Sequence, residues 1–298
     1  MQYIVYQAYG HIDILNECCY SILSLLKYNQ STPLTIVIYT DQKKHFNFLN
    51  QAQIEFIEIN SVTVHEYKGK HNFVHRVKIK VLEDFCTRYS GKFIYVDTDI
   101  YFFKNISPLF DKIAEGHFLM CNNEGSITNK KNRVFVKFKR FIDQNETYLK
   151  QNHIPISPAI EMWNAGVLGM QTSDAAIIAK ALSTNDLIYD AFSSHIVEQM
   201  SFTYQLQCSG KIDGSTDYLF HYWNFKEFRT VLKEYFEFHI SNGSNFDKFI
   251  STIDFIKPND LIKPKLEYEQ LPLLAKTLRK LKGKKNRWKI PVYSIDSF

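Results

Sequence analysis

Two aspartates one residue apart follow a short apolar run in the first third of the chain. The run is KFIYV at residues 92–96, and Asp97 and Asp99 come directly after it. Because side chains repeat with period two along an extended chain, both carboxylates can face one ligand. Two such carboxylates repel each other unless a cation lies between them, and hard divalent cations bridge carboxylate and phosphate oxygens. The pattern therefore predicts a divalent metal site for a phosphate-bearing substrate, with a structural loop cap as the alternative.

The run before these aspartates has the character of a buried strand in a parallel sheet. Short β-rich segments alternate with helical patterns through the first hundred residues. The predicted strands are 3–7, 34–39, 54–59 and 92–96, and the main predicted helices are 12–28 and 73–89. Such alternation predicts an α/β fold with a mostly parallel sheet between helices. Ligands of these sheets bind beyond the carboxyl ends of the strands, where Asp97 and Asp99 would lie.

The second half of the chain is less regular at first. Residues 122–160 are polar and contain a basic cluster that includes Lys130 and Lys131, and we interpret this stretch as an insertion over the site for acceptor binding. A solvated hairpin or helix is the alternative. WNAGVLGM at 163–170 predicts another buried strand, followed by a capped helix and a long helix around 188–206.

Positive charge is concentrated near the carboxyl end. The net charge is +5, yet the stretch from Lys276 to Lys289 holds eight Lys or Arg and no acid, so the rest of the chain is net acidic. No basic face of the kind that binds nucleic acid is indicated. The leucines at helical spacing beside these cations predict peripheral contact with an anionic membrane, with a solvated helix that closes the domain as the alternative. They are Leu271, Leu274, Leu278 and Leu281.

The cysteines and the apolar runs indicate the cellular compartment in which the protein works. The five cysteines form no CxxC pair and no regular framework, which favours a reducing environment. The first residues lack a secretory pattern, and no apolar run approaches the roughly 20 residues that a spanning helix needs. We expect a soluble cytoplasmic protein that could work at the inner face of the membrane.

The segment KFIYVDTDIYFFKNISPLF at 92–110 resembles the strand, DxD motif and following segment of GT-A glycosyltransferases, particularly the family 8-like group. The resemblance implies the GT-A (Rossmann-like) fold, with a central, mostly parallel sheet flanked by helices. It also implies a hexosyltransferase that takes a nucleotide-diphosphate sugar, a UDP-sugar, as donor and a glycan or lipid-linked glycan as acceptor. We expect the catalytic domain to span residues 1–256, with a basic tail over 257–298.

Other motifs match the same family in order, and they imply the site residues. The resemblance implies Mn²⁺ or Mg²⁺ bound by Asp97, Asp99 and His221. In RVKIKVLEDF, YQAYGHIDI, WNAGVLGM and FHYWNFKEFR it implies donor contacts from Ala8, Tyr9, Arg76, Lys78, Asn164, Ala165, Gly166 and Lys226, and in the DxD motif from Asp97. Trp163 is a further donor-site candidate because its ring is large enough to stack on a sugar or base, with core packing as the alternative. HIVEQM resembles the family's acidic-Gln pair and implies catalytic roles for Glu198 and Gln199. The chain departs from the family pattern after His221, where the Gly and Pro-Trp are missing.

Three alternatives remain open at this level. The family resemblance implies retention at the anomeric carbon, whereas an inverting reaction needs a base, for which Glu161 and Glu198 are candidates. A GT-A-like chain could also bind a nucleotide-sugar or glycan without turnover. A phosphatase of the HAD type also carries DxD after an apolar strand, but usually near the start of its domain.

Overall fold

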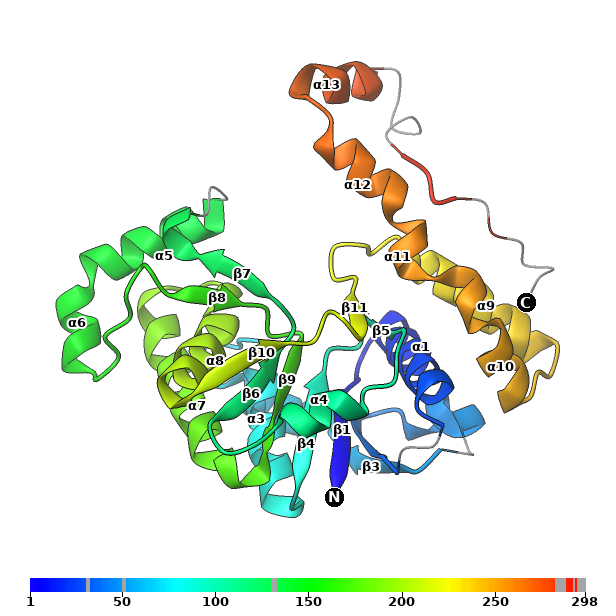
Figure 1. Cartoon of the computed structure of the whole chain (residues 1–298), viewed down its shortest axis with the longest axis horizontal. Helices are drawn as coiled ribbons and strands as arrows, with labels where there is room; N and C mark the ends of the chain where they lie inside the picture. Colours follow the sequence, from blue (N-terminus) through cyan, green and yellow to red (C-terminus); the bar gives the residue numbers. More distant parts are fainter. Residues whose placement is uncertain (31–32, 50–51, 130–132, 282–287, 292, 294–298) are drawn as a thin grey trace.

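The computed structural model describes residues 1–30, 33–49, 52–129, 133–281, 288–291 and 293. Its centre is a seven-stranded sheet in the order β10-β6-β9-β4-β1-β2-β3 (Figure 1). The strands are β1 Gln2–Gln7, β2 Thr35–Thr40, β3 Ile54–Glu58, β4 Lys92–Val96, β6 His117–Met120, β9 Val167–Gln171 and β10 Lys211–Gly214. Neighbouring strands run parallel except β9, which pairs antiparallel with both β4 and β6. The predicted mostly parallel α/β sheet is confirmed.

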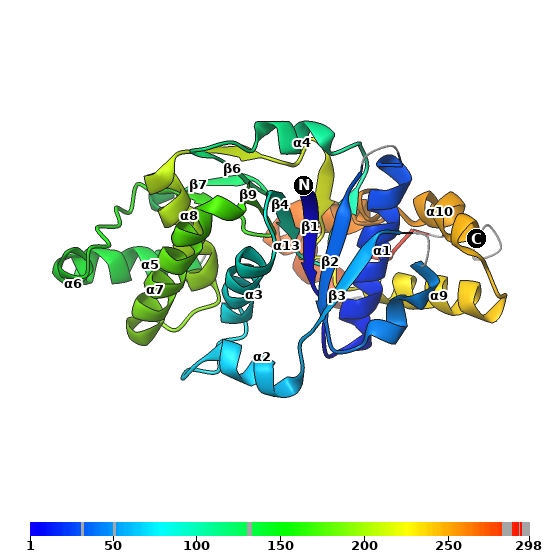
Figure 2. The ribbon, with the colours of Figure 1, turned by 90° about the horizontal axis from the view of Figure 1, so that it is seen from below.

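Helices cover both faces of this sheet. The helices packed on it or beside it are α1 Ile12–Tyr28, α2 Ser61–Lys68, α3 Arg76–Arg88, α4 Ser107–Lys112, α7 Ala175–Ala191, α8 Ile196–Ser209, α9 Phe228–Ser241 and α10 Phe246–Thr252. In β1 the side chains of Ile4 and Tyr6 enter the core under α1, whereas Tyr3 and Val5 enter the core under α3. Figure 2 shows α1 and α3 on opposite sides of the sheet. Because both faces are covered, the central strands are apolar along their whole length.

The helix predicted around 188–206 is two helices in the structure. α7 ends at Ala191 and α8 begins at Ile196. The predicted strand at 163–170 is likewise divided, because residues up to Trp163 belong to β8 and those from Val167 to β9. The break between β8 and β9 places residues 164–166 beside the end of β4.

A small lobe extends from the sheet over α7 and α8. It contains β7 Asn123–Ser126, α5 Arg133–Gln144, α6 Glu146–Gln151 and β8 Glu161–Trp163, and β7 pairs antiparallel with β8. Phenylalanines at helical spacing in α5 face a separate core that includes Ile188 and Met200. The 122–160 stretch is therefore a mostly helical lobe with its own core. Lys130 and Lys131 lie outside the described residues.

After β10 the chain enters a second small sheet, in which β11 Leu219–His221 pairs with β5 Ile100–Phe102. After α10, the 3-10 helix at Ile253–Ile256 leads into α11 Pro258–Leu261, α12 Lys263–Gln270 and α13 Leu273–Leu281. These helices rise away from the sheet on the side opposite the small lobe (Figure 1). Residues 282–287 of the basic tail lie outside the described residues.

His239 on α9 supports the packing of α9 against α10 and predicts a pH effect on stability. Its buried ring contacts the hydroxyls of Ser244 and Thr252 at 2.9 and 3.0 Å. Burial first, and Lys248 second, lower the pKa of His239 from 6.5 to about 4. Since the unfolded chain takes up the proton more readily, stability falls as the pH drops from 6.5 toward 4.

We expect the wild-type protein to lose about 2 kcal/mol more stability than His239→Gln between pH 7 and pH 5. Urea unfolding of both proteins at the two pH values measures this difference. The exposed His65 serves as the control, since His65→Gln should keep the wild-type pH dependence. Equal losses in wild type and His239→Gln would contradict the assignment to His239.

Candidate metal and donor site

The two aspartates lie at the carboxyl end of β4, in the middle of the sheet. The backbone N–H of Asp97 donates to the carbonyl of Gly166 at 2.8 Å, which fixes the start of the loop. β5 begins immediately after Asp99, and its pairing with β11 places His221 opposite Ile100. The sheet pairing therefore brings residues far apart in the sequence to the end of β4.

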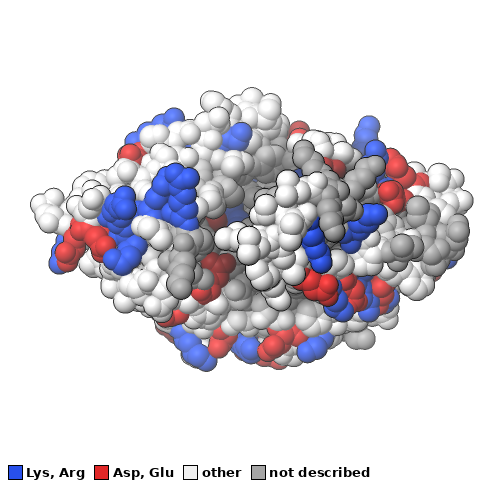
Figure 3. Space-filling view, turned by 90° about the horizontal axis from the view of Figure 1, so that it is seen from above, with Lys and Arg blue, Asp and Glu red and all other residues white. Residues whose placement is uncertain are grey.

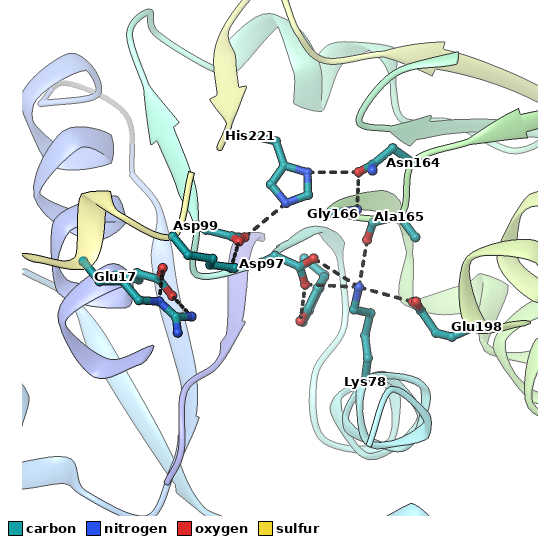
Figure 4. Close-up of polar contacts among 12 residues, drawn as sticks. Glu17, Lys78, Asp97, Asp99, Asn164, Ala165, Gly166, Glu198 and His221 are labelled. Carbon is teal, nitrogen blue, oxygen red and sulfur yellow. Dashed lines mark hydrogen bonds and ion pairs between the residues drawn. The ribbon is translucent and has the colours of Figure 1, made fainter. Parts of the chain in front are cut away.

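Asp99 is buried between two cationic partners. Its Oδ1 lies 3.1 Å from Nε2 of His221 (Figure 4), and its Oδ2 accepts from Nζ of Lys226 at 2.9 Å. Burial alone would raise the pKa of Asp99, but His221 and Lys226 hold it well below its usual range. Burial would lower the pKa of His221, but the negative charge of Asp99 outweighs this effect and raises it to about 10. The pair is therefore ionised at neutral pH.

Asp97 is neutralised by a different cation, the buried Lys78 of α3. Nζ of Lys78 lies 3.1 Å from Oδ1 of Asp97, 3.2 Å from Oε1 of Glu198 and 3.0 Å from the carbonyl of Ala165. The hydroxyl of Tyr95 donates to the same Asp97 oxygen at 2.9 Å. Burial would lower the pKa of Lys78, but the two carboxylates raise it, so Lys78 stays charged. Burial raises the pKa of Glu198 to about 7 despite the opposing effect of Lys78.

Asp97, Asp99 and His221 form a candidate metal centre. Each offers one ligand atom, and these atoms lie within 4.8 Å of one another. Two carboxylates and one imidazole form a donor set that Mn²⁺ accepts, whereas Mg²⁺ prefers oxygen ligands alone. In the structure, Lys226 supplies the positive charge beside Asp99, and its half-exposed side chain is free to turn toward another anion.

A cavity of about 370 Å³ opens beside this centre. Its wall includes Tyr9, Lys78, Asp97, Asp99 and Lys226 together with other residues of β1, α1 and the segment before α3. Figure 3 looks onto this end of the molecule and shows a central hollow with acidic side chains near it. The cavity has room for a ligand beside the two aspartates.

The residues around WNAGVLGM meet this site from the other side. Oδ1 of Asn164 accepts from the backbone N–H of Gly166 at 2.9 Å and lies 3.0 Å from Nδ1 of His221. Nε2 of Gln199 donates to Glu124 at 3.2 Å, and Glu124 also accepts from Asn164. Asn164, Gly166 and Gln199 are thus linked to the metal centre through a chain of hydrogen bonds.

Three of the predicted residues lie differently from the rest. Arg76 points away from the cavity, since its guanidinium donates to Asp186 of α7 at 2.7 and 2.9 Å. Trp163 packs against the core under α3, and its backbone N–H donates to Thr203 at 3.3 Å. The side chain of Ala8 is buried, so this residue could offer only its backbone to a ligand.

Sequence reasoning missed several polar residues at the site. Arg229 of α9 donates to Glu17 of α1 at 2.8 and 3.0 Å, and both side chains line the cavity. Burial raises the pKa of Glu17, and Arg229 opposes this effect. Arg229 lies in the FKEFR segment quoted above. Nothing in the sequence around Glu17 on α1 indicates that it pairs with Arg229. Glu124 gives no signal either, because its neighbours are defined only by the fold.

Comparisons with known proteins bear on the family and the fold. A family model described as glycosyl transferase family 8 matches residues 7–176, which is more than half of the chain. Among solved structures, an active-site mutant of LgtC has a TM-score of 0.50 at 14% identity, with 72% of each chain covered. The apo form of mouse xyloside xylosyltransferase 1 has a TM-score of 0.47 at 11% identity, with 72% of this chain and 85% of that chain covered.

A third solved structure, the glycosyltransferase GlyE of Streptococcus pneumoniae, has a TM-score of 0.43 at 13% identity. The alignment covers 72% of this chain and 46% of that chain. No curated protein matches the sequence.

Gly166 leads to a prediction about His221. A Cβ on Gly166 would lie 2.3 Å from Cε1 and 2.5 Å from Nδ1 of the His221 ring, which is closer than such atoms approach. Gly166→Ala should therefore displace the ring from Asp99 and weaken Mn²⁺ binding by roughly 10-fold or more, at a stability cost of about 1–3 kcal/mol.

Calorimetric Mn²⁺ titration and thermal melts measure these two effects. Gly214→Ala is the matched control, because its Cβ would meet atoms no closer than 3.6 Å. Wild-type Mn²⁺ affinity in folded Gly166→Ala would contradict the assignment of His221 as a metal ligand.

Proposed function

The chain belongs to glycosyl transferase family 8, and from this premise we propose that it transfers a sugar from a UDP-sugar donor to a glycan or lipid-linked glycan acceptor. The observation that carries the proposal is the Asp97, Asp99 and His221 group on the wall of a cavity at the carboxyl end of the sheet. Residues 1–256 would form the catalytic part. The family membership favours this reading over the phosphatase alternative.

The proposed cofactor is Mn²⁺, or Mg²⁺, held by Asp97, Asp99 and His221. When bound, such a cation neutralises negative charge on the departing diphosphate. The protein supplies further positive charge from Lys226, whose side chain is 53% exposed and can leave Asp99 for a phosphate. Arg229 is the next cation along the cavity wall, although Glu17 already neutralises it.

The donor would lie with its base near the end of β1 and its sugar near β9. Ala8 and Tyr9 follow β1, and Tyr9 lines the cavity, so they would contact the base. The sugar would lie against residues 164–166, with the buried Glu198 behind Lys78.

We propose that the anomeric configuration is retained. An inverting reaction would need a carboxylate base beside the acceptor hydroxyl. Glu198 is engaged by Lys78 deep in the protein, and Glu161 is exposed on β8. Neither environment suits a base that must remove a proton from an incoming acceptor. Gln199 would then contact the reacting face of the donor sugar without accepting its proton.

Thermal melts with UDP, GDP, CDP and their common sugars, with and without Mn²⁺, test the donor class. We expect a Mn²⁺-dependent rise in the melting midpoint for the uridine ligands, because ligands that bind the folded state stabilise it. Asp99→Asn should abolish this rise and lower transfer roughly 100-fold or more, since it removes a metal ligand.

Asp111→Asn, which changes an exposed carboxylate on α4, should behave as wild type. A normal Mn²⁺-dependent shift in Asp99→Asn would contradict the metal assignment. Tight donor binding by the wild type without transfer or donor hydrolysis would favour the non-catalytic alternative.

We also propose that α13 contacts an anionic membrane surface, where a lipid-linked acceptor would be presented. Leu273, Leu274, Leu278 and Leu281 are 61–82% exposed on this helix, which is unusual for a soluble surface. Lys276 and Arg279 lie among them, and no acid occurs from Leu271 to Lys289. Figure 1 places α13 and the basic α5 on the same side as the carboxyl ends of the strands.

This contact would be peripheral. Among the described residues no helix is long and apolar enough to cross a membrane. Burial of each leucine side chain in the lipid interface would contribute up to about 1.5–3 kcal/mol, and each nearby cation about 1 kcal/mol.

Flotation with vesicles of neutral lipid, and of neutral lipid mixed with phosphatidylglycerol, tests the membrane contact. We expect binding only to the anionic vesicles, and a loss of roughly 10-fold or more in Leu274→Asp/Leu278→Asp. Val62→Asp is the control, because Val62 is 64% exposed on α2, away from α13. Equal binding to both vesicle types, or by the double variant, would contradict the proposal.

A further inference from the structure

Glu124 lies outside the cavity wall and outside the metal-ligand set, yet it contacts both amide side chains of the site. Its Oε1 accepts from Nδ2 of Asn164 at 3.4 Å, and its Oε2 accepts from Nε2 of Gln199 at 3.2 Å. One carboxylate therefore joins β7 to the turn before β9 and to α8.

The backbone of β7 is shaped to aim this side chain. The pairing of β7 with β8 shifts register between Asn123 and Gly125, so that Glu124 sits at a bulge. Gly125 has a φ of +84°, and the side chain of Asn123 accepts from its N–H. Bulges redirect a side chain out of the regular strand alternation, and here the bulge turns Glu124 toward Asn164 and Gln199.

Glu124 and the backbone N–H of Gly166 together decide which way the Asn164 amide faces. An ionised carboxylate only accepts hydrogen bonds, so the NH₂ group of Asn164 must face Glu124. Oδ1 of Asn164 then faces Gly166, whose N–H donates to it at 2.9 Å. The same oxygen lies 3.0 Å from Nδ1 of His221, and an amide oxygen cannot donate. Nδ1 of His221 must therefore carry the hydrogen.

The consequence reaches the metal centre. With the Nδ1 hydrogen held by Asn164, Nε2 is the ring atom that faces Asp99, 3.1 Å away. A metal bound by the aspartates would replace the hydrogen on Nε2 of the ionised ring and accept its lone pair, while Nδ1 keeps its own hydrogen. If the Asn164 amide were reversed, its NH₂ group would face Nδ1 and would favour the opposite tautomer.

We propose that Glu124 is a positioning residue that acts through Asn164 to set the His221 tautomer for metal binding. Its other oxygen holds the carboxamide of Gln199. This inference rests on the proposed metal-dependent function. Glu124 touches neither metal nor substrate in this scheme. Glu124 would change the metal affinity because it orients His221, and not only because it carries a negative charge.

The test is Mn²⁺ affinity in the presence of saturating UDP, measured from free Mn²⁺ by electron paramagnetic resonance. Glu124→Gln keeps the side-chain volume, but its own amide can accept from only one neighbour. We expect it to weaken Mn²⁺ binding roughly 10-fold, in the range usual for residues that orient metal ligands. Glu124→Asp keeps the charge but is one methylene shorter, and it should also weaken binding.

A double-mutant cycle separates orientation from charge. In a His221→Ala background Glu124→Gln should have no further effect on Mn²⁺ affinity, because the group that it positions is gone. Glu115→Gln removes an exposed negative charge from the turn before β6 and should leave the affinity unchanged. Thermal melts without metal establish that each variant is folded.

The outcomes distinguish the two proposals. An undiminished effect of Glu124→Gln in the His221→Ala background, or wild-type affinity in Glu124→Asp, would show a charge effect and overturn the positioning role alone. Wild-type affinity in folded Glu124→Gln would overturn it as well. No Mn²⁺ binding by the wild-type protein with UDP would overturn both the positioning role and the metal-dependent function.

Discussion

Asp97 and Asp99 lie at the end of β4 with one residue between them, and the repulsion between their carboxylates must be offset in the folded protein. The chain uses separate cations for this purpose. Lys78 neutralises Asp97 from α3, whereas Asp99 is neutralised by His221 at the end of β11 and by Lys226 in the segment after it. Lys78 is deeply buried and has a second acid beside it, so it stays in place. Lys226 is half-exposed and is the partner that a ligand can replace.

Because each aspartate has its own cationic partner, the site is stable without a metal and still presents both carboxylates to one. The buried charges are paired, which avoids the large cost of an isolated ion in a low-dielectric interior. In the proposed function, a divalent cation would exchange with a proton of His221 and with the ammonium of Lys226. Binding of metal and of a diphosphate would then be linked, because the Lys226 cation released from Asp99 is close to the cavity that the diphosphate would enter.

The sequence was informative wherever chemistry lay within one element. Strand alternation predicted the parallel sheet, and the motif order predicted the family, which the family match confirms. A helix pattern cannot decide between Arg76 and Lys78, because the orientation of α3 toward the sheet selects Lys78. Glu124 was beyond sequence reasoning, since its role depends on a bulge and on two amides distant in the chain. The long helix predicted across residues 188–206 was wrong because it passed over Ser193 and Ser194, a residue type favoured at helix starts, in the break between α7 and α8.

The antiparallel strand β9 has a consequence for the order in which this protein can mature. It enters between β4 and β6 only after the small lobe has been made, and it carries residues 164–166 to the end of β4. His221 follows later still, on β11. Contacts that join distant parts of a chain form slowly, because loop closure costs entropy before the contacts are gained. During synthesis, the nascent chain therefore displays the aspartate pair long before the imidazole that completes the centre has left the ribosome.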